Sequence, residues 1–241
     1  MNEPTDGTSS ATSPTTLRVL FTLTIAAPMR ELTERFRAAT GIDLDITFDP
    51  TTLLVQRIEA GDEADVVVLT KEEIDRLTLD GTLAAGSAAD VVRSFVGVGV
   101  QAGASKPAIG TVAEFTDALR NARSIVYSQA GASGLFFADL LERLGVATEV
   151  NAKAIVIPRG FTGELAANGQ AELAIQQVSE LMYVPGVDVV GRLPAEIGRD
   201  AVFSAGVMAT STRPAEATAL IAFLRSAEAA PVMQHFGLDP L

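Results

Sequence analysis

The chain has 241 residues, with 18 Lys plus Arg against 30 Asp plus Glu, which gives a formal net charge of -12. This length suits one large domain or two small ones, and the apolar content of 48% is typical of a packed globular protein. Because the negative surplus repels phosphate backbones and anionic lipid, we expect no nucleic-acid partner. No apolar run reaches the roughly 18 residues that a membrane span needs, so we expect no membrane insertion.

The sequence contains no Cys and a single His, His235. This composition excludes thiol nucleophiles, iron–sulfur clusters, thiolate zinc sites and multi-histidine metal centres. We therefore expect neither a metal nor a cofactor.

The first 16 residues are polar and predict a flexible tail. They contain neither a basic n-region nor an apolar h-region, so the sequence as it stands predicts a cytoplasmic protein. If Met1 is not the native start, the segment belongs to a processed export product. The expected location is then periplasmic or extracellular.

After this tail, short apolar runs alternate with amphipathic segments, which predicts strands connected through helices into a mostly parallel sheet. In chain order the first set is strand 17–23, helix 28–40, strand 43–48, helix 52–60, strand 64–69 and helix 71–79. A second set is helix 111–122, strand 124–127, helix 133–144, strand 154–157, helix 162–168 and strand 172–176. Residues 213–226 and 227–235 are predicted as closing helices.

Two longer β-rich runs, residues 91–100 and 201–210, predict strands that cross between two lobes. We therefore predict an α/β fold of two lobes, each a mostly parallel sheet flanked by helices. Lobe 1 is predicted to comprise residues 17–95 and 205–241, and lobe 2 residues 96–204. Ligands of open α/β sheets bind beyond the carboxyl ends of the strands, so we expect a ligand in the cleft between the lobes.

Four segments that follow predicted strands combine hydroxyls and small residues: residues 22–28, 49–53, 128–134 and 158–162. A helix N-terminus offers unsatisfied N–H donors and about half a positive charge, which together favour an anion. The alternative for each hydroxyl is a plain helix cap, for Arg159 a solvated surface position, and for Gln176 an amide that satisfies the backbone. The candidate ligand-binding residues are Thr22, Thr24, Thr51, Thr52, Ser128, Ser133, Arg159 and Gln176.

Two carboxylates, Asp49 and Glu164, are predicted to lie near this cleft. Either is a candidate general base if it is buried beside the ligand, because desolvation raises a carboxyl pKa toward neutrality. The alternative is that both are solvated or cap a helix.

Several stretches resemble the molybdate-type solute-binding proteins of ABC importers. The first lobe carries Phe36 before Thr40-Gly41, and then Ile58-Glu59-Ala60-Gly61-Asp62-Glu63-Ala64-Asp65-Val66. Farther on, the chain is similar to a branch of that family that includes periplasmic aconitate isomerases. The matching stretches are residues 131–134, 141–145, 169–173, 184–187, 191–196 and Gln176-Gln177-Val178-Ser179-Glu180-Leu181.

The resemblance spans residues 17–241 and implies the type II periplasmic-binding-protein fold and a small anionic ligand. The hydroxyl that such proteins offer from the second loop falls on Thr51, whereas the usual Ser of the first loop falls on Phe21, with Thr22 and Thr24 nearest. Arg159 suits a planar carboxylate, which favours an organic di- or tricarboxylate over an oxyanion such as molybdate. If the protein is exported, an ABC permease is the implied partner.

The same resemblance leaves a second function open. An aconitate isomerase-like enzyme would use this cleft to move a proton next to a carboxylate of a small unsaturated acid.

Overall fold

A computed structural model of the protein describes residues 15–241. The predicted tail lies outside the described residues except for Thr15 and Thr16, and Thr16 begins strand β1. None of the helices in the described range is both long and apolar enough to cross a membrane.

The first part of the molecule is built on three parallel strands, β1 (Thr16–Thr22), β2 (Asp43–Asp49) and β3 (Val66–Thr70). Strand β9 (Asp200–Val207) joins them antiparallel to β3. Helices on both faces allow the inner strand β3 to be a continuous apolar run, in which Val66, Val67 and Val68 are fully buried. The helices of this part are η1 (Leu23–Ile25, a 3-10 helix), α1 (Ala26–Thr40), α2 (Thr51–Glu59), α3 (Lys71–Leu79), α9 (Pro214–Leu224) and α10 (Ala230–His235).

The second part repeats the parallel arrangement in β5 (Ile125–Ser128), β6 (Ala154–Ile157) and β7 (Leu173–Gln177). Strand β8 (Val187–Arg192) lies at its edge. Its helices are α4 (Val112–Asn121), α5 (Ala132–Arg143), α6 (Ala147–Asn151), α7 (Gly163–Ala167) and α8 (Val178–Tyr183).

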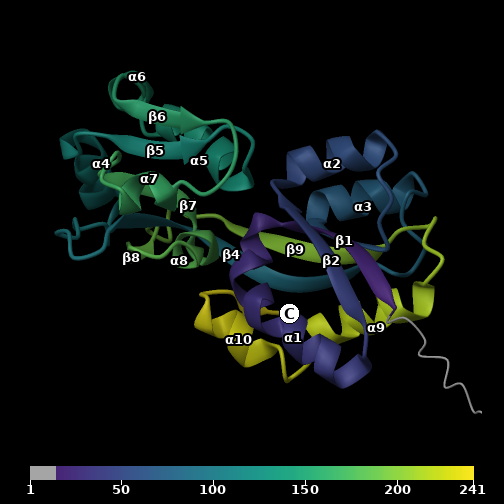
Figure 1. The fold of residues 1–241 in the computed structure, drawn as a ribbon. Coiled ribbons are helices and arrows are strands. Elements are labelled where there is room, and N and C mark those ends of the chain that lie inside the picture. Colours follow the sequence, from purple (N-terminus) through teal and green to yellow (C-terminus); the bar gives the residue numbers. More distant parts are fainter. Residues whose placement is uncertain (1–14) are drawn as a thin grey trace, which may run out of the picture.

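Strand β4 (Ala89–Gln101) passes from one part into the other, as Figure 1 shows. It pairs with β9 up to Phe95 and with β7 and β8 from Val96 or Gly97 onward. The chain returns to the first part through residues 193–199, and the short strand β10 (Asp239–Pro240) pairs with β4 there. Strand β9 thus enters the first sheet at Asp200, four residues before the predicted end of lobe 2 at residue 204. The exact division of the chain into two lobes stays a prediction.

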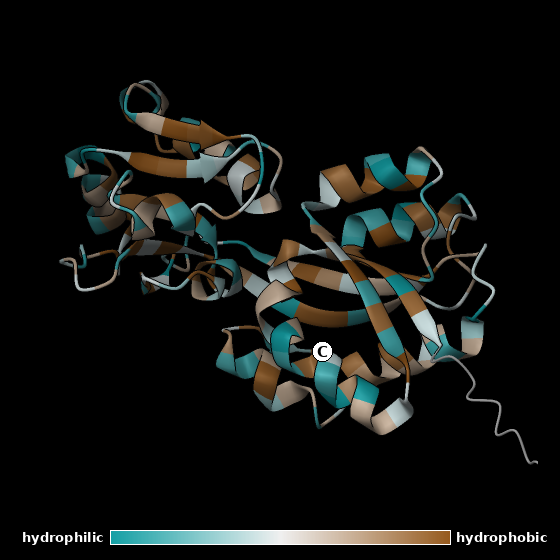
Figure 2. Cartoon of the chain, viewed as in Figure 1, coloured by the Kyte–Doolittle hydropathy of each residue, from teal (hydrophilic) through white to brown (hydrophobic). Residues whose placement is uncertain are grey.

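Separate hydrophobic cores stabilise the two parts. In the first part, Phe21, Phe36 and Phe203 are fully or almost fully buried, and in the second part Phe115 and Phe137 are fully buried in a different cluster. Figure 2 shows the same division, with hydrophobic strands inside each part and hydrophilic positions along the outer helices. The observed α/β architecture confirms the predicted fold class.

The predicted elements agree with the observed ones except for the short elements η1 and β10 and for the chain between residues 145 and 200. Helix α6, helix α8 and strand β8 were not predicted. Each has only five or six residues, too few to show a hydrophobic period. One of these short elements carries the most important side chain of the site described next.

Candidate functional site

The carboxyl ends of β1 and β2 in the first part, and of β5 and β7 in the second, meet at one small cavity. This is the arrangement expected of ligand sites in α/β proteins. The cavity is lined by Thr22, Leu23, Thr24, Pro50, Thr51, Ser128, Gly131, Ala132, Gly160, Gln176, Glu180 and Phe203. Predicted residues Thr22, Thr24, Thr51, Ser128 and Gln176 are thus brought together, from segments far apart in the sequence.

Three helices begin at this cavity without a side-chain cap. Neither η1, α2 nor α5 has a side chain that accepts a hydrogen bond from its first turn. The first N–H groups of a helix have no acceptor within the helix. In the described chain, the backbone N–H groups of Thr51, Thr52, Ala132 and Ser133 can therefore donate to a ligand. The capping alternative raised by the sequence therefore does not apply at these starts. Their dipoles favour an anion in the cavity.

The glycines between β5 and α5 serve the packing of their own loop. A Cβ on Gly134 would lie 1.7 Å from the backbone oxygen of Ser128, and one on Gly131 would lie 2.4 Å from Ser128 Oγ. The hydroxyl of Ser128 accepts a hydrogen bond of 3.0 Å from the N–H of Gly131. Small residues here allow the start of α5 to pack directly against the end of β5, so that the first turn of the helix borders the cavity.

Glu180, on the short helix α8, is the only acidic side chain in the cavity lining among the described residues. The residue is 6% exposed, and its Oε1 accepts a hydrogen bond of 2.9 Å from the hydroxyl of Thr24. Burial raises the pKa of Glu180 to about 7, against hydrogen bonds from Thr24, the Gln176 side chain and the Gln177 backbone, which lower it. A carboxyl group with this pKa exchanges a proton near neutral pH.

Gln176 has a structural task at the end of β7. Its Oε1 accepts hydrogen bonds from the backbone N–H and the hydroxyl of Thr162, at 2.7 and 2.8 Å, and its Nε2 donates to the carbonyl of Gly160 at 2.9 Å. The amide thereby fixes the loop after β6 against the cavity. This is the backbone-satisfying alternative that the sequence left open.

Sequence reasoning missed Glu180 as a functional residue, because it treated residues 178–181 only as part of a resemblance. The signal was present: an acidic residue three positions after the end of a buried strand, flanked by Val178 and Leu181. An acidic side chain in so apolar a segment is expected to be buried or functional.

The other predicted site residues lie outside the cavity lining. Glu164 is exposed on α7, and Ser133 is buried in the first turn of α5. Thr52, on α2, is exposed, and its hydroxyl donates a hydrogen bond of 2.9 Å to the carbonyl of Ala130 in the second part.

Asp49 and Arg159 pair with one another instead of facing the cavity. The distance between Arg159 Nη1 and Asp49 Oδ1 is 3.5 Å, and Arg57 Nε lies 3.3 Å from Asp49 Oδ2. The Arg159 side chain is 62% exposed. The predicted carboxylate clamp and the predicted base are thus ion-paired with each other at the outer edge of the site.

The two parts are closed over the cavity. The free space among the lining side chains is about 10 Å³, roughly the room that one water needs. Polar contacts bridge the parts at Thr24–Glu180, Thr52–Ala130 and Arg159–Asp49. A larger ligand therefore requires the parts to move apart.

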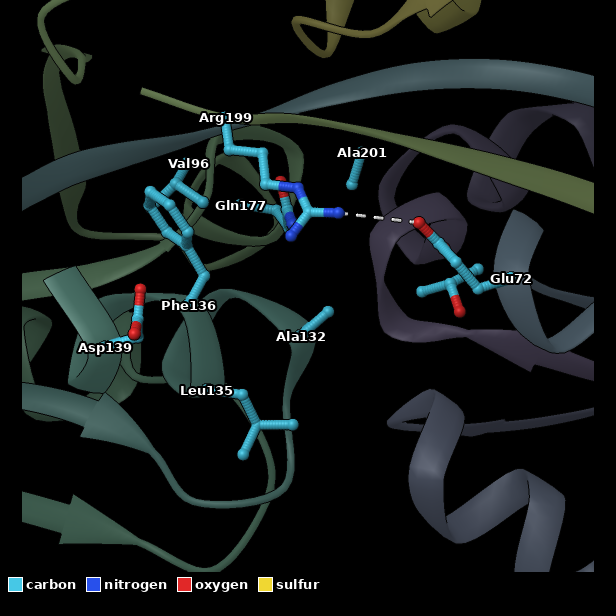
Figure 3. A pocket seen from close by; sticks show the side chains of 10 residues that line it. Glu72, Val96, Ala132, Leu135, Phe136, Asp139, Gln177, Arg199 and Ala201 are labelled. Atoms are coloured by element: carbon cyan, nitrogen blue, oxygen red, sulfur yellow. Dashed lines mark ion pairs between the residues drawn. The ribbon is translucent and has the colours of Figure 1, made fainter. Parts of the chain in front are cut away.

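A larger and more open cavity of about 420 Å³ shares Ala132 with the first and extends between α3, α5 and the crossing strands. Figure 3 shows its mainly apolar wall, with Leu135 and Phe136 on α5 and the guanidinium of Arg199 directed at Glu72. Arg199 Nη2 lies 3.6 Å from Glu72 Oε1, so its charge is already paired. The acidic first turn of α3, Glu72 and Glu73, disfavours an anion there.

No group of three or more His, Asp or Glu side chains in residues 15–241 is arranged to hold a metal ion. The hydroxyls and backbone N–H groups at the small cavity are neutral donors, which suit an anion.

Known proteins resemble the chain in sequence and in architecture. A family model described as bacterial extracellular solute-binding protein matches residues 17–239. An aconitate isomerase from Pseudomonas sp is 34% identical over 233 residues, covering 94% of this chain and 88% of that protein.

Solved structures have the same fold at lower identity. The periplasmic molybdate-binding protein of Azotobacter vinelandii superposes with a TM-score of 0.77 at 19% identity, over 92% of this chain and 98% of that one. The sulfate-binding protein SubI of Mycobacterium tuberculosis H37Rv has a TM-score of 0.73 at 16% identity, over 94% of this chain and 87% of that one. With its type II fold and a family match that spans nearly all of its described residues, the chain belongs to the bacterial extracellular solute-binding protein family.

Proposed function

We propose that the protein binds a small anion, an organic di- or tricarboxylate or an oxyanion such as molybdate, in the small cavity between its two parts. The observation that carries this proposal is the convergence of uncapped helix starts from both parts on one buried space. Hydroxyls of Thr22, Thr51 and Ser128 add neutral donors. Such donors bind an anion in a low-dielectric site without a fixed counter-ion.

Binding is coupled to closure in this proposal. Residues 17–95 with 205–241 and residues 96–204 act as lobes that separate about β4 and the return segment 193–199. Closure then brings Thr51 and Ala132, on opposite sides of the cavity, onto the same ligand.

Isothermal titration calorimetry over oxyanions and di- and tricarboxylates tests the proposal. We expect saturable binding of at least one such anion, and an Ala132→Leu variant that loses it because the added side chain fills the cavity. Ala138→Leu, on an exposed position of the same helix α5, is the matched control and keeps the affinity. Binding that survives in Ala132→Leu places the ligand elsewhere and contradicts the proposal.

As a member of its family, the protein would deliver this ligand to an ABC permease if it is exported to the periplasm or cell exterior. Ligand-dependent stimulation of the ATPase of a reconstituted permease tests this partner. An ATPase rate that is the same with and without the liganded protein contradicts it.

A second candidate function is the isomerisation of a small unsaturated carboxylic acid. Two observations favour it: the 34% identity to an aconitate isomerase, and the placement of Glu180 in the cavity. In this reaction the Glu180 carboxylate takes a proton from the methylene carbon next to a carboxylate, and the electron pair spreads over the adjacent double bond. The same carboxyl returns the proton to the far carbon, so that the double bond moves and no atom is gained or lost. The uncapped N–H groups stabilise the charge that develops on the carboxylate oxygens.

Proton NMR of cis- and trans-aconitate incubated with the protein in deuterated water tests this candidate. We expect interconversion together with deuterium at carbon, both abolished in Glu180→Gln. An anion that binds without exchange or interconversion excludes the isomerase and leaves the binding function standing.

A further inference from the structure

The cavity places an acidic side chain where the proposed function places an anion. Glu180 belongs to the lining together with the three helix starts, and its Oε1 is held toward the first part by the hydroxyl of Thr24 at 2.9 Å. The lining contains no Lys, Arg or His in the described chain. A bound anion therefore meets a carboxyl group with no cation between them.

The elements packed against α8 supply no counter-charge for Glu180. These elements are η1, α1, β4, β7 and β8, and η1 and β7 carry no charged residue. On β4, Asp90 pairs with Lys71 and Arg93 with Asp200, and on β8, Arg192 lies over the Phe95 ring while Asp188 accepts from the N–H of Gly103.

The charges of α1 and of the site edge are also engaged elsewhere. The Arg30 guanidinium lies 3.8 Å from the centre of the Tyr183 ring, which itself stacks on Phe161. The remaining charges of α1 form the exposed pairs Glu31–Arg35 and Glu34–Arg37. Asp49 pairs with Arg57 and Arg159.

Two negative groups in contact within so small and buried a space repel strongly, because little solvent screens them. A single proton between them removes the repulsion and adds a hydrogen bond. That bond is strongest when both groups hold the proton with similar affinity, as two carboxylates do, whereas sulfate is a far weaker base.

We propose that Glu180 and the bound anion share one proton, so that binding takes up a proton and the cavity selects carboxylates over strong-acid oxyanions such as sulfate. This inference rests on the proposed anion-binding function and names its substrate class. The raised pKa of the unliganded carboxyl is consistent with it, because the group already holds its proton more tightly than a solvated glutamate.

Calorimetry with trans-aconitate in two buffers of different ionisation enthalpy measures the proton directly. At about pH 8, where Glu180 is mostly ionised before binding, we expect the wild-type protein to take up close to one proton per anion. The affinity of the wild type should fall toward tenfold for each pH unit above neutrality. The Glu180→Gln variant keeps the shape of the side chain but takes up no proton, and its affinity is nearly independent of pH. Asp49→Asn, which removes the other carboxylate of the cleft, takes up the same proton as the wild type.

The outcomes separate the two proposals. Saturable binding by the wild type without proton uptake contradicts the proposal of a shared proton and leaves the anion-binding function intact. This measurement requires only the wild-type protein. Proton uptake that persists in Glu180→Gln assigns the proton to another group and also overturns the inference. No saturable heat with either trans-aconitate or sulfate overturns both proposals.

The selectivity for carboxylates has its own readout. We expect the wild-type protein to bind trans-aconitate more tightly than sulfate. In Glu180→Gln the ratio of the two affinities should be smaller, because the amide cannot share a proton with the ligand. An unchanged ratio of the two affinities contradicts the carboxylate assignment.

Discussion

Two buried carboxylates, Asp49 and Glu180, have different surroundings, and only Glu180 belongs to the cavity lining. Asp49, at the end of β2, lies between the guanidinium groups of Arg57 and Arg159. Glu180, on α8, receives hydrogen bonds from a hydroxyl, an amide and a backbone N–H, and burial dominates its pKa. Asp49 is thus ion-paired at both carboxylate oxygens, whereas burial raises the pKa of Glu180 to about 7.

This difference shows why proximity to a cleft does not identify a catalytic or binding carboxylate. The better candidate is the carboxyl group whose environment brings its pKa close to the working pH. The ion-paired carboxylate of Asp49 instead links the two parts of the molecule through Arg159. The same contrast suggests experiments that treat the two positions as a matched pair.

The largest expected effect is on the pH dependence of stability in Glu180→Gln. The folded pKa of Glu180, about 7, exceeds the ordinary value of 4.5 for a glutamate, so the folded state binds this proton more tightly than the unfolded state does. The proton therefore stabilises the wild-type fold fully below pH 4.5, and this stabilisation is lost as the pH rises toward 7. The amount is about 3 kcal/mol, and Glu180→Gln should remove this part of the pH dependence.

Chemical denaturation of the unliganded protein at a series of pH values measures this effect. Asp49→Asn is the control, and should keep the wild-type loss between pH 4.5 and 7. Parallel curves for wild type and Glu180→Gln would show that Glu180 does not titrate in this range.

A smaller effect is expected for Thr24→Val, which removes the hydroxyl that donates to Glu180 at 2.9 Å but keeps the branched shape. A hydrogen bond to a charged group contributes about 2 kcal/mol, and less when the carboxyl is neutral. We therefore expect Thr24→Val to cost more stability above neutral pH than in acid, and to raise the pKa of Glu180 further. The comparison of denaturation midpoints at the two pH values checks this, and an equal cost at both contradicts a hydrogen bond to the ionised form.

The smallest effect on stability is expected for the exposed ion pair between Arg159 and Asp49. Arg159 is 62% exposed, so Arg159→Ala should change the free energy of unfolding by less than about 1 kcal/mol. High salt should reduce even this difference, because it screens exposed ion pairs. If Arg159 clamps the ligand directly, as the sequence suggested, Arg159→Ala will instead abolish binding measured by calorimetry.

Much of the fold was predictable because it depends on local periodicity. Helix α3 (Lys71–Leu79) and strand β6 (Ala154–Ile157) occupy the predicted residues, since apolar positions and their boundaries are visible within a few residues of sequence. The loops that line the cavity were predictable for the same reason, because each follows a clear strand.

The chemistry of the site was less predictable because it depends on contacts between distant residues. The pair Arg159–Asp49 joins positions 110 residues apart, and Thr24–Glu180 joins positions 156 apart. Nothing local distinguishes the carboxylate that finds an arginine from the one that is buried. Glu180 also lies on a helix of six residues, too short to be recognised from its pattern.

A crystal structure of the protein with trans-aconitate tests the central claim most directly. We predict that a carboxylate of the ligand lies within hydrogen-bond distance of backbone N–H groups at the starts of α2 and α5, with a second carboxylate oxygen against Glu180. Density for the anion beside Arg159 or in the larger cavity next to Arg199, with the space around Ala132 still closed, would contradict the account.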